Sequence, residues 1–214
     1  MGGIADEHVE WAVVNRFKAM LDAPPKSKFN VTQSFALFSA IILWTKQRAW
    51  VGGDARDRPP WFGEADHAAR EARDALRLTG ICDPPWSLSK VRPRFGRAQE
   101  RDVSDFVHDR VNTDFEDMSA EQFVKWLRDA LAHGDGRTIR PLHKPSRTSD
   151  KTYLAGFKIV FPAERKTTRF LALSLYHADM VRIGSILADT FCKALSGGDR
   201  YFEEVPSALV IEAA

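Results

Sequence analysis

The run from Phe35 to Trp44 (FALFSAIILW) is the most apolar stretch of the sequence, and it places the strongest constraint on the fold. It is about half the length that a membrane-spanning helix needs. Asn30 and Gln33, just before it, have the spacing of a capping box, which opens a helix. The pattern therefore predicts a buried helix over about residues 30–50, which the rest of the chain has to surround.

Four further segments carry apolar residues at helical spacing, namely residues 6–21, 64–78, 119–133 and 178–195. Two β-prone runs, 153–161 and 168–176, precede the last of these helices, and the short polar segment between them predicts a hairpin. We therefore expect a mainly α fold, a helical bundle with one β-hairpin before the final helix. The chain length favours a single domain over residues 1–214.

Charge and cysteine content limit the classes of function. The 31 basic and 29 acidic residues give a net charge of +2, so any contact with nucleic acid has to come from local patches. Cys82 and Cys192 fit neither a metal-ligand pair nor a disulfide framework, which predicts inert thiols in a reducing compartment. The first ten residues include three acids and lack the apolar segment of a signal peptide. We expect a cytoplasmic protein that does not enter the membrane.

Two segments of the chain are rich in basic residues. Between Lys90 and Arg101 there are five basic residues and one acid, interrupted by a proline and a glycine. A second basic run follows the helix expected at 119–133 and includes Arg137, Arg140, His143, Lys144, Arg147 and Lys151. Both patterns predict loops, which are either solvated surface loops or contacts for phosphate groups.

The helix expected at 119–133 contains the one pattern that points to chemistry. Ser119 and Gln122 form a capping box at its start, and Gly134 stands where a C′ glycine should. Its last two turns contain Arg128, Asp129 and His133.

These three side chains have different directions on an ideal helix. Asp129 and His133 are four residues apart and share a face, so the carboxylate can orient the imidazole and favour its charged form, as does the negative end of the helix. Arg128 lies about 140° around the helix from His133. Within one chain the two converge only if the last turn is distorted or the arginine curls around the helix. A two-fold dimer could instead bring both pairs around one phosphate.

Other interpretations of the pattern remain open. Arg101 with His108 and Arg137 with His143 have similar spacings, although only Arg128 is followed by a polar residue within a capped helix that ends in glycine. A helix-end histidine that caps carbonyl groups, next to an arginine in a surface ion pair, is the structural alternative.

The element formed by Arg128, Asp129 and His133 resembles that of the HEPN family, in which Arg-polar-x-x-x-His at a helix end forms the active site of many metal-independent ribonucleases. The local resemblance runs from about Ser119 to His143, and a looser one reaches Leu195. It implies a HEPN-like helical bundle and a homodimer without metal or cofactor. It also implies an endoribonuclease that serves in defence or stress and leaves 2′,3′-cyclic phosphate ends.

The resemblance also suggests roles for individual residues. His133 would take the proton of an RNA 2′-hydroxyl, and Arg128 would hold the phosphate. Arg137, Arg140, His143 and Lys144 are the expected RNA-binding residues. Asp135 stands where toxins controlled by a nucleotidyltransferase antitoxin carry tyrosine, so control by an antitoxin or regulatory protein would take a different route.

Two other classes of function compete with this one. A catalytically inactive HEPN-like dimer that binds RNA, a nucleotide or a protein partner is the main alternative, because the same helix end suits binding and cleavage. A metal or cofactor enzyme has less support, since the sequence contains no HExxH or CxxC motif and the glycines at Gly52 lack the spacing of a phosphate loop.

Overall fold

Each of the five segments with helical spacing forms a helix in the computed structural model. The structure describes residues 9–23, 29–48, 60–88, 95–98, 107–108, 118–148, 150–162 and 170–195. Within these ranges the helices are α1 (Val9–Asp22), α2 (Asn30–Arg48), α3 (Pro60–Leu78), α4 (Ala120–His133) and α5 (His177–Leu195). The strands are β1 (Phe95–Ala98), β2 (Val107–His108), β3 (Ile139–Pro145), β4 (Thr152–Pro162) and β5 (Phe170–Tyr176).

The expected bundle with a single hairpin is wrong, because the strands form one antiparallel sheet in the order β2-β1-β5-β4-β3. The predicted hairpin exists as β4 and β5, but it forms the middle of that sheet. β3 lies in the basic run predicted as a loop, and β1 lies within Lys90–Arg101, which was also predicted as a loop. The fold is therefore a mixture of α and β structure.

The composition of β3 explains why the sequence did not reveal it. Its residues, IRPLHKP, include two prolines and three basic side chains, which is typical of a loop. β3 is the last strand of the sheet, and an edge strand tolerates proline because one of its sides has no partner to bond.

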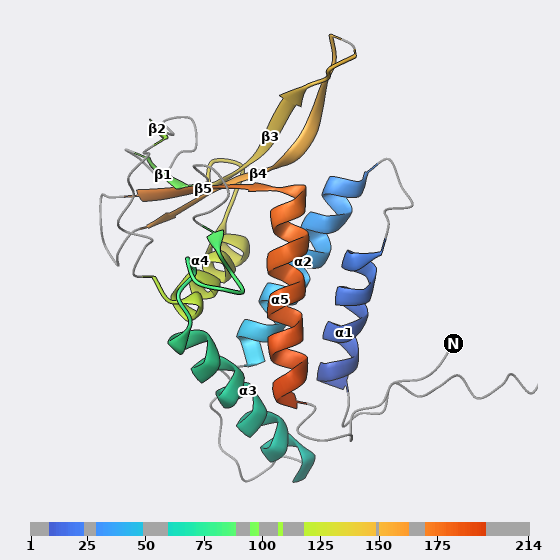
Figure 1. The fold of residues 1–214 in the computed structure, drawn as a ribbon, viewed down its shortest axis with the longest axis vertical. Helices are drawn as coiled ribbons and strands as arrows, with labels where there is room; N and C mark the ends of the chain where they lie inside the picture. The colour runs from blue at the N-terminus through green and yellow to red at the C-terminus, as the bar shows by residue number, and fades with distance from the viewer. Residues whose placement is uncertain are drawn as a thin grey trace, which may run out of the picture.

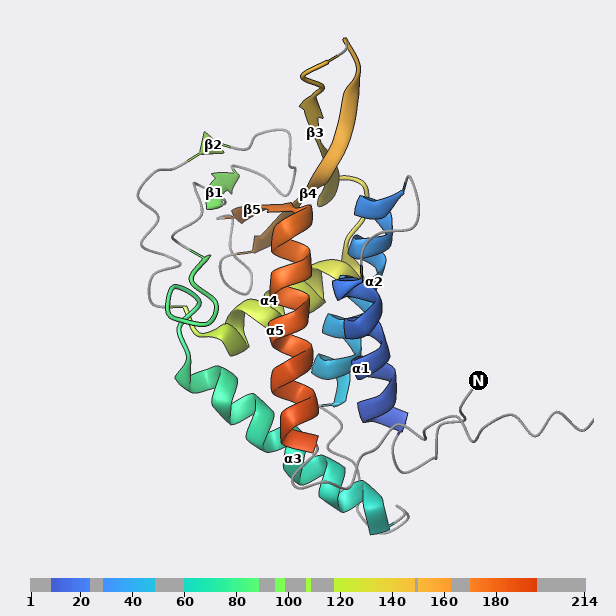
Figure 2. The ribbon, with the colours of Figure 1, turned by 45° about the vertical axis from the view of Figure 1, so that its right-hand side comes forward.

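The helices and one face of the sheet share a hydrophobic core. α5 lies against α1, α2 and α3, and α4 lies against α2 and α3. Figures 1 and 2 show α5 running along the molecule with the sheet across one end and α3 at the other. The fully buried side chains include Phe38 and Ile41 of α2, Leu127 of α4 and Leu173 of β5. The apolar run of α2 is therefore a central helix, as predicted.

The inner face of the sheet packs on the helices through alternate residues of β4 and β5. Phe157 of β4 stacks on Phe35 of α2, with ring centroids 4.0 Å apart. Ile159 is paired with Leu173 across the two strands, and both are buried in the core. Successive side chains of a strand point to opposite faces, so the residues that alternate with Phe157 and Ile159 in β4, and with Leu173 in β5, belong to the outer face.

Candidate functional site

α4 is fixed at its start and along one face, which leaves its last turn at the surface. The Ser119 hydroxyl accepts a hydrogen bond from the backbone N–H of Gln122, at 3.2 Å, as the capping box predicts. Phe123, Val124 and Leu127 are buried against the neighbouring elements. The packing therefore holds the helix in place while its C-terminal end stays accessible.

Arg128 and Asp129 form an ion pair near the end of α4. The Nη1 atom of Arg128 lies 2.7 Å from a carboxylate oxygen of Asp129, and the two side chains are 26% and 43% exposed. Asp129 lies four residues before His133 and thus on the same face of the helix. The ion pair consequently draws the guanidinium of Arg128 around the helix towards the face of His133. This is the curled arrangement by which the two side chains of one chain can approach each other.

His133 is the last residue of α4, and its side chain is exposed. We expected Asp129 to orient this imidazole, but in the structure the carboxylate pairs with Arg128. No hydrogen bond or ion pair joins His133 to another residue in the described ranges. Its ring is therefore accessible to a ligand or to another copy of the chain.

The connection from α4 to β3 is a tight turn. Gly134 has φ −75° and ψ 157°, so it is not the left-handed C′ residue that the sequence suggested. A side chain is excluded there by close contact instead, since a Cβ atom would lie 2.2 Å from the carbonyl oxygen of Ala130. The Thr138 hydroxyl accepts a hydrogen bond from the backbone N–H of Asp135, at 2.8 Å. These contacts hold the end of α4 in a fixed position relative to the start of β3.

Arg137 is engaged by a carboxylate within this turn. Its Nε and Nη2 atoms lie 3.0 and 2.7 Å from one oxygen of Asp135, and its backbone N–H donates to the other oxygen at 2.8 Å. These hydrogen bonds from Arg137 lower the pKa of Asp135 to about 2. The carboxylate of Asp135 thus offsets part of the positive charge of Arg137, one of the predicted RNA-binding residues.

The other predicted RNA-binding residues lie on a strand and not in a loop. Arg140, His143 and Lys144 are exposed on β3, which begins six residues after His133. The Nζ atom of Lys144 lies over the ring of Tyr176, 4.0 Å from its centroid, in a cation–π contact. The α4 end and β3 are joined directly by the turn, as Figure 2 shows, so basic residues continue from one to the other.

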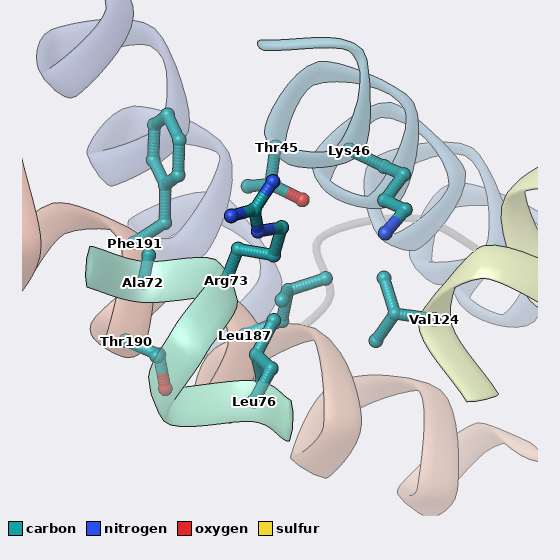
Figure 3. Close-up of a pocket in the computed structure, with 9 residues that line it drawn as sticks. All are labelled: Thr45, Lys46, Ala72, Arg73, Leu76, Val124, Leu187, Thr190 and Phe191. Carbon is teal, nitrogen blue, oxygen red and sulfur yellow. The ribbon is translucent and has the colours of Figure 1, made fainter. Parts of the chain in front are cut away.

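A cavity between α2, α3, α4 and α5 is the other place where charged groups gather. Figure 3 shows the ammonium group of Lys46 and the guanidinium of Arg73 directed into it among apolar side chains. Lys46 is only 4% exposed, and its Nζ atom lies 3.9 Å from a carboxylate oxygen of Glu121. Burial lowers the pKa of Lys46. The cavity volume is about 20 Å³, room for a water molecule, so it does not suit a substrate.

Lys46 was not among the residues predicted from the sequence, although the sequence contains a signal for its burial. Lys46 follows Ile42 by four residues, which places it on the apolar face of α2.

In the part of the chain that the structure describes, no three His, Cys, Asp or Glu side chains are grouped as ligands for a metal ion.

No protein-family model, curated protein or solved structure matches the chain. Among the described helices, none is long and apolar enough to cross a membrane. The side chains at the end of α4 and on the strand that follows it are therefore the features that bear on function.

Proposed function

We propose that this chain is a metal-independent endoribonuclease of the HEPN type that acts as a homodimer. The observation that carries the proposal is the ion pair of Arg128 with Asp129, which brings the guanidinium towards the face of the exposed His133. In the dimer, two copies of the α4 end would enclose one phosphodiester with two imidazoles and two guanidinium groups.

The chemistry needs a base, an acid and a group that stabilises negative charge. One His133 accepts the proton of the 2′-hydroxyl, and the 2′-oxygen then attacks the adjacent phosphorus atom. The bond to the 5′-oxygen breaks, and the second His133 gives that oxygen a proton. Arg128 offsets the charge that develops on the phosphate oxygens. The products are a 2′,3′-cyclic phosphate and a 5′-hydroxyl.

Asp129 acts here as a positioning residue for Arg128. An ion pair with side chains exposed to this degree is worth under about 1 kcal/mol, because water screens the two charges. A phosphate group, which accepts two hydrogen bonds from arginine, can therefore compete with the carboxylate when RNA binds. Asp129 would thus hold Arg128 near the site before the substrate arrives.

The cellular role that fits this activity is RNA cleavage in defence or stress, held in check by an antitoxin or another regulatory protein. Asp135, where related toxins have a modified tyrosine, is occupied by its contacts with Arg137. An antitoxin or regulatory protein would therefore inhibit this chain by binding it, and not by modifying the residue at position 135.

The proposal is tested by incubating the purified protein with total RNA in EDTA. We expect cleavage that persists in the chelator and falls more than about 100-fold in His133→Ala and in Arg128→Ala, since each removes one part of the charge and proton machinery. His67→Ala is the matched control, because His67 is an exposed histidine on α3. New 5′-hydroxyl ends, detected by direct labelling with polynucleotide kinase, identify the products.

A mixture of the two variants tests the composite site. A dimer of one Arg128→Ala chain and one His133→Ala chain retains one arginine and one histidine in the shared groove. The histidine can still act as the base, with water left to protonate the 5′-oxygen, so co-refolded mixtures should regain a small part of the activity. Cleavage that neither substitution changes would overturn the proposal. RNA binding without cleavage by the unmodified protein would favour the catalytically inactive dimer instead.

A further inference from the structure

The hairpin of β3 and β4 extends from the helical body, as Figures 1 and 2 both show. Its pairs run from Ile139 with Ile159 at the base to Pro145 with Thr152 near the tip. The turn is closed by a hydrogen bond from the backbone N–H of Ser146 to the carbonyl oxygen of Lys151, at 2.8 Å. Side chains beyond the base of the hairpin are mostly exposed, so this part is available to a ligand.

A bulge determines which residues share the outer face of this hairpin. Leu142 pairs with Gly156 and the next residue, His143, pairs with Leu154, so β4 has one extra residue at this point. β3 alternates through the bulge without interruption. Since Pro141 is paired with the inward Phe157, the inner face also receives His143, and the outer face receives Lys144.

Two contacts agree with this assignment. Lys144 is paired with Tyr153 and covers the ring of Tyr176, which pairs with Gly156 on the outer side. Leu154, on the other side of the bulge, packs against the hydrophobic core. The outer face therefore combines two tyrosines with Lys144, and the pair of Arg140 with Lys158 lies on the same face.

The charged side chains of the strands that form this face are all basic. None of the strands β3, β4 and β5 contains an aspartate or a glutamate. Tyr153, which pairs with Lys144, is 53% exposed, so an aromatic side chain is accessible beside a cation. Cations that hold phosphates, interleaved with exposed rings on which bases stack, are the features by which proteins bind single-stranded nucleic acid.

We infer that the outer face of β3 and β4, with Tyr176 at its border, binds a single-stranded segment of RNA. A base stacks on Tyr153, and the phosphates lie along Lys144 and Arg140. The inference rests on the proposed function in one respect: the bound strand is the substrate that continues to His133, across the short turn after α4. A duplex fits less well, because its bases are stacked already and offer the tyrosine no free face.

The test measures binding separately from cleavage by using His133→Ala as the parent protein. A fluorescent, unstructured RNA of about 12 nucleotides and a duplex of the same length are titrated and followed by anisotropy. We expect the single strand to bind more tightly than the duplex. Adding Tyr153→Ala should weaken single-strand binding roughly tenfold, the loss of one stacked base, whereas Tyr153→Phe should keep it.

Lys144→Ala should weaken binding and lower the slope of log Kd against log salt by about 0.7, the value for one phosphate contact on a single strand. Lys193→Ala is the matched control, because Lys193 is exposed at the end of α5. Circular dichroism verifies that each variant is folded. Equal binding by Tyr153→Ala, tighter binding of the duplex, or an acidic peptide that binds where RNA does not would each overturn the inference.

The outcomes for the two proposals are distinct. If the unmodified protein does not cleave RNA but Tyr153→Ala loses binding, the nuclease fails and the binding face stands as the site of a non-cleaving protein. If RNA is cleaved but Tyr153→Ala binds and cleaves as before, the nuclease stands and the binding face is wrong.

Discussion

The helical body and the region where α4 meets the sheet differ in how they affect the charged form of an ionisable side chain. In the body, Lys46 is almost fully buried, and that burial lowers its pKa. In the turn after α4, hydrogen bonds from Arg137 lower the pKa of the exposed Asp135. The first shift disfavours the charged form, whereas the second favours it. The same direction of shift therefore means a cost to stability at Lys46 and a gain at Asp135.

This difference separates a region that packs in the interior from one that keeps its charged groups accessible. The body fills its interior with apolar side chains and tolerates one lysine beside Glu121. The α4 end and the outer sheet face keep their charged groups at the surface, where an ion pair is weak enough to be exchanged. Substitutions in the body should therefore change stability, and those at the α4 end and the outer face should change activity or binding.

Leu173→Ala should give the largest effect on stability. Leu173 is 1% exposed on the inner face of the sheet, so its removal leaves a cavity and costs about 3 kcal/mol. Tyr153→Ala, on the outer face, should cost under about 0.5 kcal/mol. Urea unfolding of both variants measures the contrast, and comparable losses from the two would remove the distinction between the faces.

Lys46→Met should stabilise the protein by about 1 kcal/mol at pH 7, because it removes a buried charge and keeps the apolar stem. Glu121 would still have Arg77, 3.5 Å away, so its carboxylate would not be left alone. The pKa of Lys46 is lowered from 10.5, so the cost of its charge is complete below the folded-state pKa and disappears as the pH rises through 10.5. The advantage of Lys46→Met should therefore shrink between pH 7 and 10.5.

Thermal unfolding across that range, with Lys193→Met as the exposed control, measures this dependence. A variant less stable than the unmodified protein at pH 7 would show that the partners of Lys46 outweigh its burial.

Asp135→Asn should have the smallest effect. The pKa of Asp135 falls from 3.8 to about 2 in the folded state, so its carboxylate adds stability that is complete above about pH 4 and is lost as the pH falls towards 2. The asparagine variant should be slightly less stable at pH 6 and equal to the unmodified protein at pH 2. Urea midpoints at the two pH values measure the difference, and Asp150→Asn is an exposed control. An effect that persists unchanged at pH 2 would assign it to the backbone contacts of the turn.

Local patterns in the sequence predicted the helices well and the end of α4 only in part. The N-cap hydrogen bond at Ser119 forms as expected, and the apolar spacing placed the five described helices. Gly134 was predicted to adopt a left-handed backbone conformation, and this is wrong. A glycine is needed there because a side chain would collide with the carbonyl oxygen of Ala130. The partner of Asp129 was also different, because a side chain as long as arginine can reach around a helix and ideal geometry does not show this.

The sheet was predicted only where its strands are apolar. β4 and β5 carry the β-branched and aromatic residues that buried strands favour, whereas β3 is basic and contains prolines. Its pairing with β4 depends on contacts along the hairpin, and the bulge that turns Lys144 outwards depends on the register of both strands together. A pattern within one segment contains neither kind of information.

By itself the sequence determined where the five described helices lie and which charged residues stand at the end of α4, because capping and helical spacing depend on residues a few positions apart. Tertiary structure decided that Lys46 is buried and that a basic segment becomes the edge of a sheet. Those outcomes depend on which surfaces meet across the fold, and hence on residues far apart in the chain.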